Sequence, residues 1–230
     1  MRLQKFLSVA GCCSRRHGEE YILDGRVRVN GELIPTLGTK VDPDNDVVEL
    51  DGRIVKPVEK KIYIALNKPL GYVSSCEQPG DKIVLDLLAI DERVYPIGRL
   101  DKDSTGLLLL TNDGELHNLL SHPSFDHEKE YIVTTDQLLP DGALKHLAQG
   151  VPMMGTKTRP AVVKRISPTR FRIILKEGKN RQIRRMVRKV GGHVIALQRI
   201  RIADIRLGNL PEGRWRFLTP NEIEKLGKPD

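Results

Sequence analysis

Hydrophobic positions in the first 60 residues follow two different periods. From Leu3 to Ala10 the apolar residues are spaced as i, i+3, i+4 and i+7, which predicts a short amphipathic helix. A second helix is expected between a capping Ser14 and Gly25. Basic and apolar residues then alternate from Arg26 to Val29, directly before Asn30-Gly31. Two further strand-like runs flank Asp51-Gly52, and both dipeptides are strong hairpin turn signals. The pattern predicts a compact helix-helix-hairpin unit of about 55 residues, a size that is marginal for independent stability.

Beyond a charged segment from Lys56 to Lys61, the pattern becomes rich in strands. The expected strands are Ile62 to Leu66, Gly106 to Leu110, Glu130 to Thr135, Ala161 to Ile166, Phe171 to Leu175 and His193 to Ile202. The expected helices are Glu115 to Leu120, Asp141 to Gln149, Asn180 to Val190 and Pro220 to Leu226. Because the helices do not alternate strictly with the strands, we expect an α+β fold with a mixed, mostly antiparallel sheet flanked by helices. The predicted domains are residues 1–58 and 62–230, joined by the charged segment.

Composition narrows the class of protein. No apolar run approaches the roughly 18 residues of a membrane helix, so a membrane protein is not expected. The three cysteines include the adjacent pair Cys12-Cys13, which suits neither a disulfide framework nor a metal knuckle. We therefore expect reduced thiols and a cytoplasmic location.

Positive charge is concentrated near the C-terminus. Between Arg170 and Arg216 there are 14 basic and 3 acidic residues, a local charge of +11 within a chain whose net charge is +8. An excess dominated by arginine favours a polyanionic partner over a merely solvated basic face, and nucleic acid is the expected polyanion.

Two segments carry candidate chemistry. Polar residues from Gly98 to Gly106 lie between two apolar runs, with Asp101 flanked by Arg99 and Lys102. A simple polar turn also explains this loop. In the second segment, from Glu177 to Met186 and onward, helical periodicity places Arg181, Arg184, Arg185 and Arg188 opposite an apolar face. These arginines could bind phosphates, or one could hold a carboxylate from another loop; a solvated surface helix is the alternative.

The N-terminal unit resembles the S4 RNA-binding domain. The resemblance rests on Arg2-Leu3-Gln4-Lys5-Phe6-Leu7, on Ser14-Arg15-Arg16, and on Gly25 to Gly31. It implies RNA contacts from the six basic residues of this region: Arg2, Lys5, Arg15, Arg16, Arg26 and Arg28. Arg15 and Arg16 open the second helix, where main-chain N–H groups favour phosphate.

The rest of the chain resembles the RsuA family of pseudouridine synthases. Gly98-Arg99-Leu100-Asp101 with Ser104 to Leu108 is similar to the family's catalytic motif, and Lys68 to Gly71, Lys129 to Tyr131 and Gly178 to Arg185 are similar to three others. The wording of the last two is closest to the RluF-like subgroup, which acts on large-subunit rRNA. The resemblance implies an enzyme that isomerises a specific uridine, with 23S rRNA as the expected substrate. The alternatives are a synthase that acts on 16S rRNA and a non-catalytic, RNA-binding ribosome-assembly factor.

The resemblance also implies residue roles. Asp101 is the expected nucleophile, paired with Arg184, while Tyr131 stacks on the extruded base and Arg99 helps to evict it from the helix. Ile183 is expected to pack beneath the site. Further RNA contacts are expected from Lys68, Asn180, Arg181, Gln182, Arg185 and Arg188. Because the isomerisation changes no oxidation state and needs no energy input, neither cofactor nor metal is expected. The expected partner is rRNA, naked or in a precursor particle, with no membrane involved and the protein a monomer.

Overall fold

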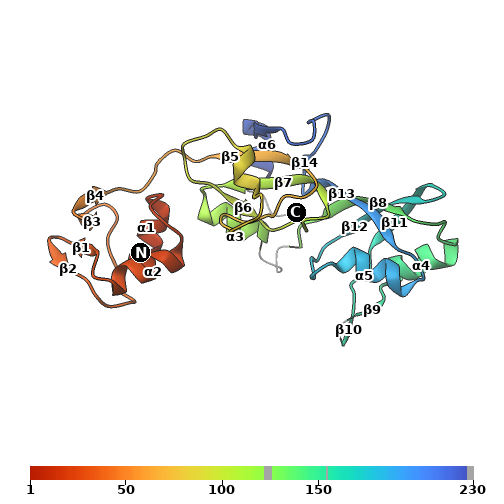
Figure 1. Cartoon of the computed structure of the whole chain (residues 1–230), viewed down its shortest axis with the longest axis horizontal. Coiled ribbons are helices and arrows are strands. Elements are labelled where there is room, and N and C mark those ends of the chain that lie inside the picture. The colour runs from red at the N-terminus through yellow and green to blue at the C-terminus, as the bar shows by residue number, and fades with distance from the viewer. Residues whose placement is uncertain (122–125, 154, 227–230) are drawn as a thin grey trace. The chain divides into compact units, whose positions relative to one another are not determined.

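The computed structural model describes residues 1–121, 126–153 and 155–226. These residues form two compact units. The first contains residues 1–62 together with two short segments, 90–94 and 112–114. The second contains the remaining residues from Tyr63 onward. Each unit has its own hydrophobic core. Figure 1 labels the helices and strands of both units along the chain.

The first unit packs two helices against a four-stranded antiparallel sheet of order β2-β1-β3-β4. Its elements are α1 (Leu3–Val9), α2 (Arg15–Leu23), β1 (Val27–Val29), β2 (Glu32–Leu33), β3 (Val48–Leu50) and β4 (Arg53–Val55). Ser14 caps α2 by accepting a hydrogen bond from the His17 N–H at 3.1 Å. The core consists largely of the apolar residues that the helical and strand periods placed inside, including Leu3, Phe6 and Ile22.

Both hairpin turns of this unit take the form that their sequences predict. Asn30 and Gly31 have φ values of 52° and 82°, and Asp51 and Gly52 have values of 51° and 75°. Two consecutive residues with positive φ are characteristic of a two-residue type I′ turn, whose twist matches that of the strands it joins. The helix-helix-hairpin expectation is therefore confirmed.

The second unit is built on a mixed sheet of order β11-β12-β8-β13-β7-β5-β15, with β14 paired to β13 and β6 to β7. Its strands are β5 (Tyr63–Lys68), β6 (Tyr95–Ile97), β7 (Thr105–Thr111), β8 (Lys129–Thr135), β11 (Val162–Ser167), β12 (Arg170–Leu175), β13 (Val194–Ile202), β14 (Ile205–Arg206) and β15 (Trp215–Phe217). Its helices are η1 (Val84–Leu87), α3 (Gly114–Ser121), α4 (Asp141–Gln149), α5 (Gln182–Lys189) and α6 (Pro220–Leu226), and a small hairpin joins β9 (Pro152–Met153) to β10 (Thr156–Lys157). Within the described residues, β7 and β13 pair in parallel and the other neighbouring strands pair antiparallel.

The strand β7 lies inside the sheet and is buried on both faces, which explains its uninterrupted run of leucines. Leu107 and Leu109 join one core cluster, which also contains Leu120 of α3 and Leu226 of α6. Elsewhere α4 packs against β11 and α5 against β13. The loop that precedes β7 is therefore attached to a buried strand inside the sheet.

The α+β fold with a mixed, mostly antiparallel sheet is the one expected, and every predicted strand and helix of this unit is present with small shifts at its ends. Cys12, Cys13 and Cys76 form no disulfide. Burial raises the pKa of the Cys13 thiol to about 11, so this thiol is protonated at neutral pH. Within the described ranges no helix has the length and apolar character needed to cross a bilayer.

Candidate active site

The loop between β6 and β7 carries Asp101 and ends in a tight strand-strand contact. Gly98 leaves β6 with φ of 69°, and Gly106 enters β7 with φ of 103°. Gly106 faces Arg199 of β13, and a Cβ on Gly106 would lie 2.2 Å from the Arg199 carbonyl oxygen and 2.7 Å from its nitrogen. Only glycine combines this backbone conformation with this approach. The two glycines therefore fix where the loop begins and ends.

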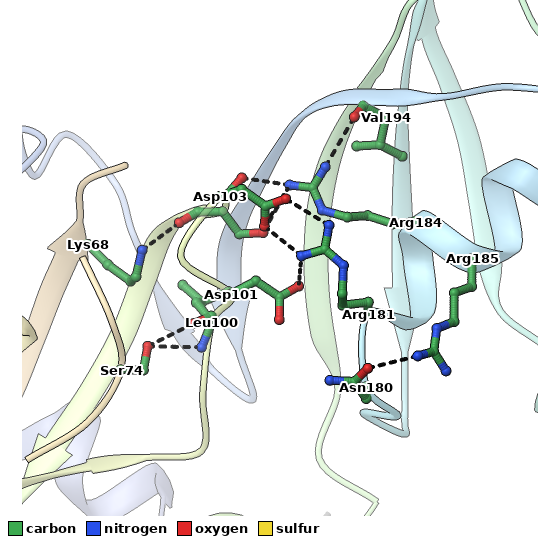
Figure 2. Close-up of polar contacts among 11 residues, drawn as sticks. Lys68, Ser74, Leu100, Asp101, Asp103, Asn180, Arg181, Arg184, Arg185 and Val194 are labelled. Atoms are coloured by element: carbon green, nitrogen blue, oxygen red, sulfur yellow. Dashed lines mark hydrogen bonds and ion pairs between the residues drawn. The ribbon is translucent and has the colours of Figure 1, made fainter. Parts of the chain in front are cut away.

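Every main-chain carbonyl from Arg99 to Ser104 accepts a hydrogen bond. Arg199 Nη1 donates to Arg99, Ser74 Oγ to Leu100, the Ser104 N–H to Asp101, the Gly71 N–H to Lys102, Arg184 Nη2 to Asp103 and Lys68 Nζ to Ser104, at distances of 2.6 to 3.3 Å. Figure 2 shows the contacts made by Lys68, Ser74 and Arg184. Three of the six donors are cationic side chains reaching in from β5, α5 and β13. The loop is therefore held in one conformation from several sides, as a preorganised catalytic carboxylate requires.

Asp101 lines a cavity of about 290 Å³. The cavity also contains the ring of Tyr131 and the apolar side chains of Leu100, Leu175, Ile183 and Leu197, with Arg99 and Arg181 among its polar lining. Its volume is at the small end of ligand sites, which suits one extruded base rather than a stacked base pair. Asp101, Tyr131, Arg99 and Ile183 therefore line one cavity.

The cation beside Asp101 is not the one that was expected. Arg181 Nη1 lies 3.6 Å from Asp101 Oδ2, and the same guanidinium donates two hydrogen bonds to the Asp103 carboxylate at 3.0 and 2.8 Å (Figure 2). Arg184 instead donates to the Asp103 carbonyl at 2.6 Å, to Ser104 Oγ at 3.3 Å and to the Val194 carbonyl at 3.1 Å. The predicted Arg184–Asp101 pair was therefore wrong: Arg184 holds the loop backbone, and Arg181 supplies the positive charge.

Asp103 is the counter-charge that connects the two arginines. Its carboxylate accepts both hydrogen bonds from Arg181 and lies 3.4 Å from Arg184 Nη2. The hydrogen bonds from Arg181, together with the charges of Arg184 and Arg181, hold the pKa of Asp103 below its usual range. No local pattern indicates this role, because 78 residues separate Asp103 from Arg181.

Helix α5 also differs from the pattern read from the sequence. The helix begins at Gln182, and Arg181 has a left-handed φ of 50° just before it, so Arg181 is not on the helical stripe. Arg184 is turned inward, which leaves the exposed Arg188 and the half-buried Arg185 on the outer face. Asn180 is exposed and accepts a hydrogen bond from Arg185 at 2.9 Å. The four arginines therefore divide between the site and the surface.

Two of the residues expected to contact RNA are buried. Lys68 is 0% exposed and donates to the Ser104 carbonyl at 2.8 Å and the Pro69 carbonyl at 3.0 Å. Gln182 is 4% exposed; its amide accepts from the Lys179 N–H at 2.9 Å and donates to Glu177. Both side chains are directed to internal partners, so the structure does not support the RNA contacts expected from Lys68 and Gln182. Both side chains instead stabilise the segments of the site through internal hydrogen bonds.

In the first unit, the basic residues fall into two groups. Arg2, Arg15 and Arg16 are exposed, and Lys5 is half-buried. Arg26 stacks over the Tyr21 ring at 4.1 Å and donates two hydrogen bonds to Asp51 at 2.9 and 2.7 Å. Arg28 donates to the Gly31 carbonyl at 2.9 Å. The contacts of these last two stabilise the hairpins, while the first group is the more available to a ligand.

Three further residues of the site were not predicted from the sequence, namely Asp103, Ser74 and Arg199. Arg199 had a usable signal, because it lies two residues after the buried Leu197 on a strand, and so falls on the same buried face. Among the described residues, no three His, Cys, Asp or Glu side chains are arranged as a metal-ligand set.

Known proteins are similar to this chain along almost its whole length. Residues 62–189 match the family model described as RNA pseudouridylate synthase, and residues 1–48 match the S4 domain. The chain is 44% identical over 230 residues to the dual-specificity RNA pseudouridine synthase RluF of Escherichia coli strain K12, covering 99% of this chain and 79% of that protein. It is 41% identical over 233 residues to the ribosomal large subunit pseudouridine synthase B of Bacillus subtilis strain 168, covering 98% and 95%. A crystal structure of a pseudouridylate synthase is similar with a TM-score of 0.73 and 29% identity, covering 98% of this chain and 99% of that one.

Proposed function

Because the chain belongs to the RNA pseudouridylate synthase family, we propose that it isomerises a specific uridine of large-subunit (23S) ribosomal RNA to pseudouridine. Membership of the family makes it an enzyme of RNA modification. The choice of RNA is supported by the similarity to the ribosomal large subunit synthase of B. subtilis and to RluF. The observation that carries the proposal is the Asp101 carboxylate, held on a loop whose carbonyls are all hydrogen-bonded, inside a cavity walled by Tyr131.

The reaction moves one glycosidic bond. Asp101 acts as the nucleophile, at C1′ of the ribose or at C6 of the uracil, and the N1–C1′ bond breaks. The freed base rotates within the cavity, C5 bonds to C1′, and the Asp101 carboxylate is released. The proton leaves C5 and N1 gains one, so the product is an isomer of the substrate and no other reactant is consumed.

Each residue around the cavity has a part in this sequence. Tyr131 stacks on the extruded base and is placed to assist proton removal from C5. Arg181 keeps a positive charge 3.6 Å from the Asp101 carboxylate. Arg99, exposed at the rim of the cavity, occupies the space that the base leaves in the RNA helix. Ile183 closes the floor of the cavity.

RNA binding is assigned to both ends of the chain. We propose that residues 1–58 form the S4 unit and residues 62–230 the catalytic domain. Arg2, Lys5, Arg15 and Arg16 in the first, and Asn180, Arg181, Arg185 and Arg188 in the second, would contact the RNA. Since the substrate is ribosomal RNA, the protein would act in the cytoplasm, and we propose that it acts as a monomer.

The test is release of tritium from RNA labelled at C5 of uridine. Large-subunit rRNA, small-subunit rRNA and bulk tRNA are compared, each with the wild-type chain and with Asp101→Asn. We expect stoichiometric release from large-subunit rRNA only, lost in the variant while RNA affinity stays within a few-fold. Release from another RNA alone would correct the substrate. Tight binding without release from any RNA, naked or in ribosomal particles, would favour an assembly factor instead.

A further inference from the structure

A second cavity, of about 460 Å³, adjoins the catalytic one in the second unit. The two cavities share the side chains of Arg99 and Tyr131 and the segment Glu177 to Lys179. The side chains of Lys129 and Tyr131 also lie on the same face of β8, because they are two residues apart on a strand. Whatever occupies the second cavity is therefore next to a base stacked on Tyr131.

The lining of this cavity is strongly cationic. Six basic side chains, Arg99, Lys129, Arg159, Lys176, Lys179 and Arg199, face two acidic ones, Asp126 and Glu177.

Both acids already have partners. Asp126 accepts two hydrogen bonds from Arg159, one of them at 2.7 Å. Glu177 accepts from the Gln182 amide and the Arg159 N–H and lies 3.5 Å from Lys179 Nζ. Of the six basic residues, the other four have no carboxylate partner among the described residues.

Arg199 is a buried cation whose hydrogen-bonding groups are only partly satisfied. It is 2% exposed and lies directly across from Tyr131 on the neighbouring strand. Its Nε donates to the Leu107 carbonyl at 2.7 Å and its Nη1 to the Arg99 carbonyl at 3.3 Å. Its Nη2 is shielded from solvent and has no hydrogen-bond partner among the described residues. A buried guanidinium without a counter-charge is costly, and an anion in the adjoining cavity would offset that cost.

The ammonium of Lys129 is likewise poorly satisfied by hydrogen bonds. Its ammonium makes one weak hydrogen bond, to the His127 carbonyl at 3.3 Å. Burial lowers the pKa of Lys129 and the positive charge of Arg199 lowers it further, while the negative charge of Asp126 offsets part of this shift. Two neighbouring cations thus repel each other in a partly desolvated site.

We propose that the second cavity binds a backbone phosphodiester of the RNA strand, at a linkage adjacent to the target uridine. Lysine and arginine are the residues that bind phosphate, and the lining is too cationic for a neutral base. This proposal rests on the proposed function, because it assumes a uridine bound against Tyr131. The bound phosphate would hold the strand on the enzyme after the base leaves its helix.

The test uses the full-length chain in an Asp101→Asn background, so that binding is measured without turnover. Lys129→Gln and Lys176→Gln are compared with Lys164→Gln, which makes the same change of charge at an exposed position of β11 outside the cavity. The probe is a synthetic RNA stem-loop that contains the target uridine in its unmodified form. We expect Lys129→Gln to weaken binding about tenfold. The slope of log affinity against log salt should fall by about 0.7, and the control should change neither quantity.

A neutral linkage identifies the phosphate. A methylphosphonate is placed in turn at each linkage flanking the target uridine. At one of these positions it should weaken binding to the parent protein about tenfold but add no further loss in Lys129→Gln. Equal losses in both proteins at every position, or test variants that bind like Lys164→Gln, would overturn the proposal.

Two controls separate this proposal from others. Inorganic phosphate, titrated at constant ionic strength, should not displace the stem-loop more than chloride does; tight, saturable displacement would assign the cavity to free phosphate and overturn the assignment to the strand. In the parent chain with Asp101 intact, normal tritium release together with no coupling to Lys129 would refute the phosphate site alone. Absence of release from every RNA would refute the proposed function.

Discussion

Lys68 offers a sharp test of how the catalytic loop is held. Its side chain is 0% exposed, and its ammonium donates to the Ser104 and Pro69 carbonyls at 2.8 and 3.0 Å. Burial lowers its pKa from 10.5 to about 8, although Asp103 and Asp101 pull the pKa upward. The perturbation is Lys68→Met, which keeps the length of the side chain and removes the charge.

The magnitude follows from opposing contributions. A pKa of about 8 instead of 10.5 means that the fold disfavours the charged form by about 3 kcal/mol. Each hydrogen bond from a charged donor stabilises by about 1.5–3 kcal/mol, so the two bonds of Lys68 together stabilise by about 3–6 kcal/mol. Because methionine removes both the buried charge and the two hydrogen bonds, we expect the free energy of unfolding at pH 7 to fall by only about 1–2 kcal/mol.

The dependence on pH has a definite sign. The folded-state pKa of Lys68 lies below the unfolded one, so between pH 8 and 10.5 the unfolded chain binds more protons. The contribution of Lys68 to the free energy of unfolding therefore increases as the pH rises. Methionine does not titrate, so the variant lacks this increase. The deficit of Lys68→Met should grow by about 2 kcal/mol between pH 7 and pH 9.5.

The assay is urea unfolding at both pH values, followed by fluorescence. Trp215 is the one tryptophan of the chain, and it pairs with Leu66 two residues before Lys68, so the signal reports the correct unit. Lys164→Met serves as the exposed control. A deficit that stays constant with pH would refute the argument that Lys68 is a buried, partly desolvated cation. In RNA binding, an unchanged affinity with a reduced kcat would agree with an internal strut, whereas a large loss of affinity would restore the phosphate contact first expected.

Three other changes test separate features. Gly106→Ala should cost more than about 3 kcal/mol of unfolding free energy or prevent folding, because its Cβ would meet the Arg199 backbone at 2.2 Å; a stable, active variant would contradict the tight contact. Arg181→Gln should lower kcat for tritium release at least tenfold while changing stability by less than about 1 kcal/mol, since its ion pair is half-exposed; normal turnover would remove Arg181 from the site. Arg15→Gln combined with Arg16→Gln should reduce the salt slope of rRNA binding by about 1.4, and an unchanged slope would take the first unit out of recognition.

Local patterns predicted the fold well where the elements are long. The leucine run of β7 and the alternation in β8 identify strands because burial on two faces or on one dictates those patterns. The strands β9, β10 and β14 contain two residues each, too few to show a period. These short strands form because the tertiary fold brings a partner backbone within hydrogen-bonding distance, and a local pattern does not show this.

The site was harder to predict than the fold, for a related reason. The motif around Asp101 and the tyrosine of β8 are local strings, and a family resemblance finds them. The partner of Asp101 depends on a left-handed residue at 181, which breaks the helical periodicity from which the arginine stripe was drawn. A helical projection assumes regular φ and ψ, so it fails at the residue where the backbone departs from them.

The concentration of positive charge also overstated the surface available to RNA. Of the 14 basic residues between Arg170 and Arg216, several serve internal partners. These pairs include Arg172 with Glu130, Arg201 with Glu128 and Glu130, Arg216 with Glu222, and Arg181 with Asp103. The four acids of these pairs all lie outside the stretch from Arg170 to Arg216, so a net charge of +11 counts the cations without their partners. The number of phosphates that this region neutralises, and with it the salt dependence of binding, should therefore be smaller than the sequence count implies.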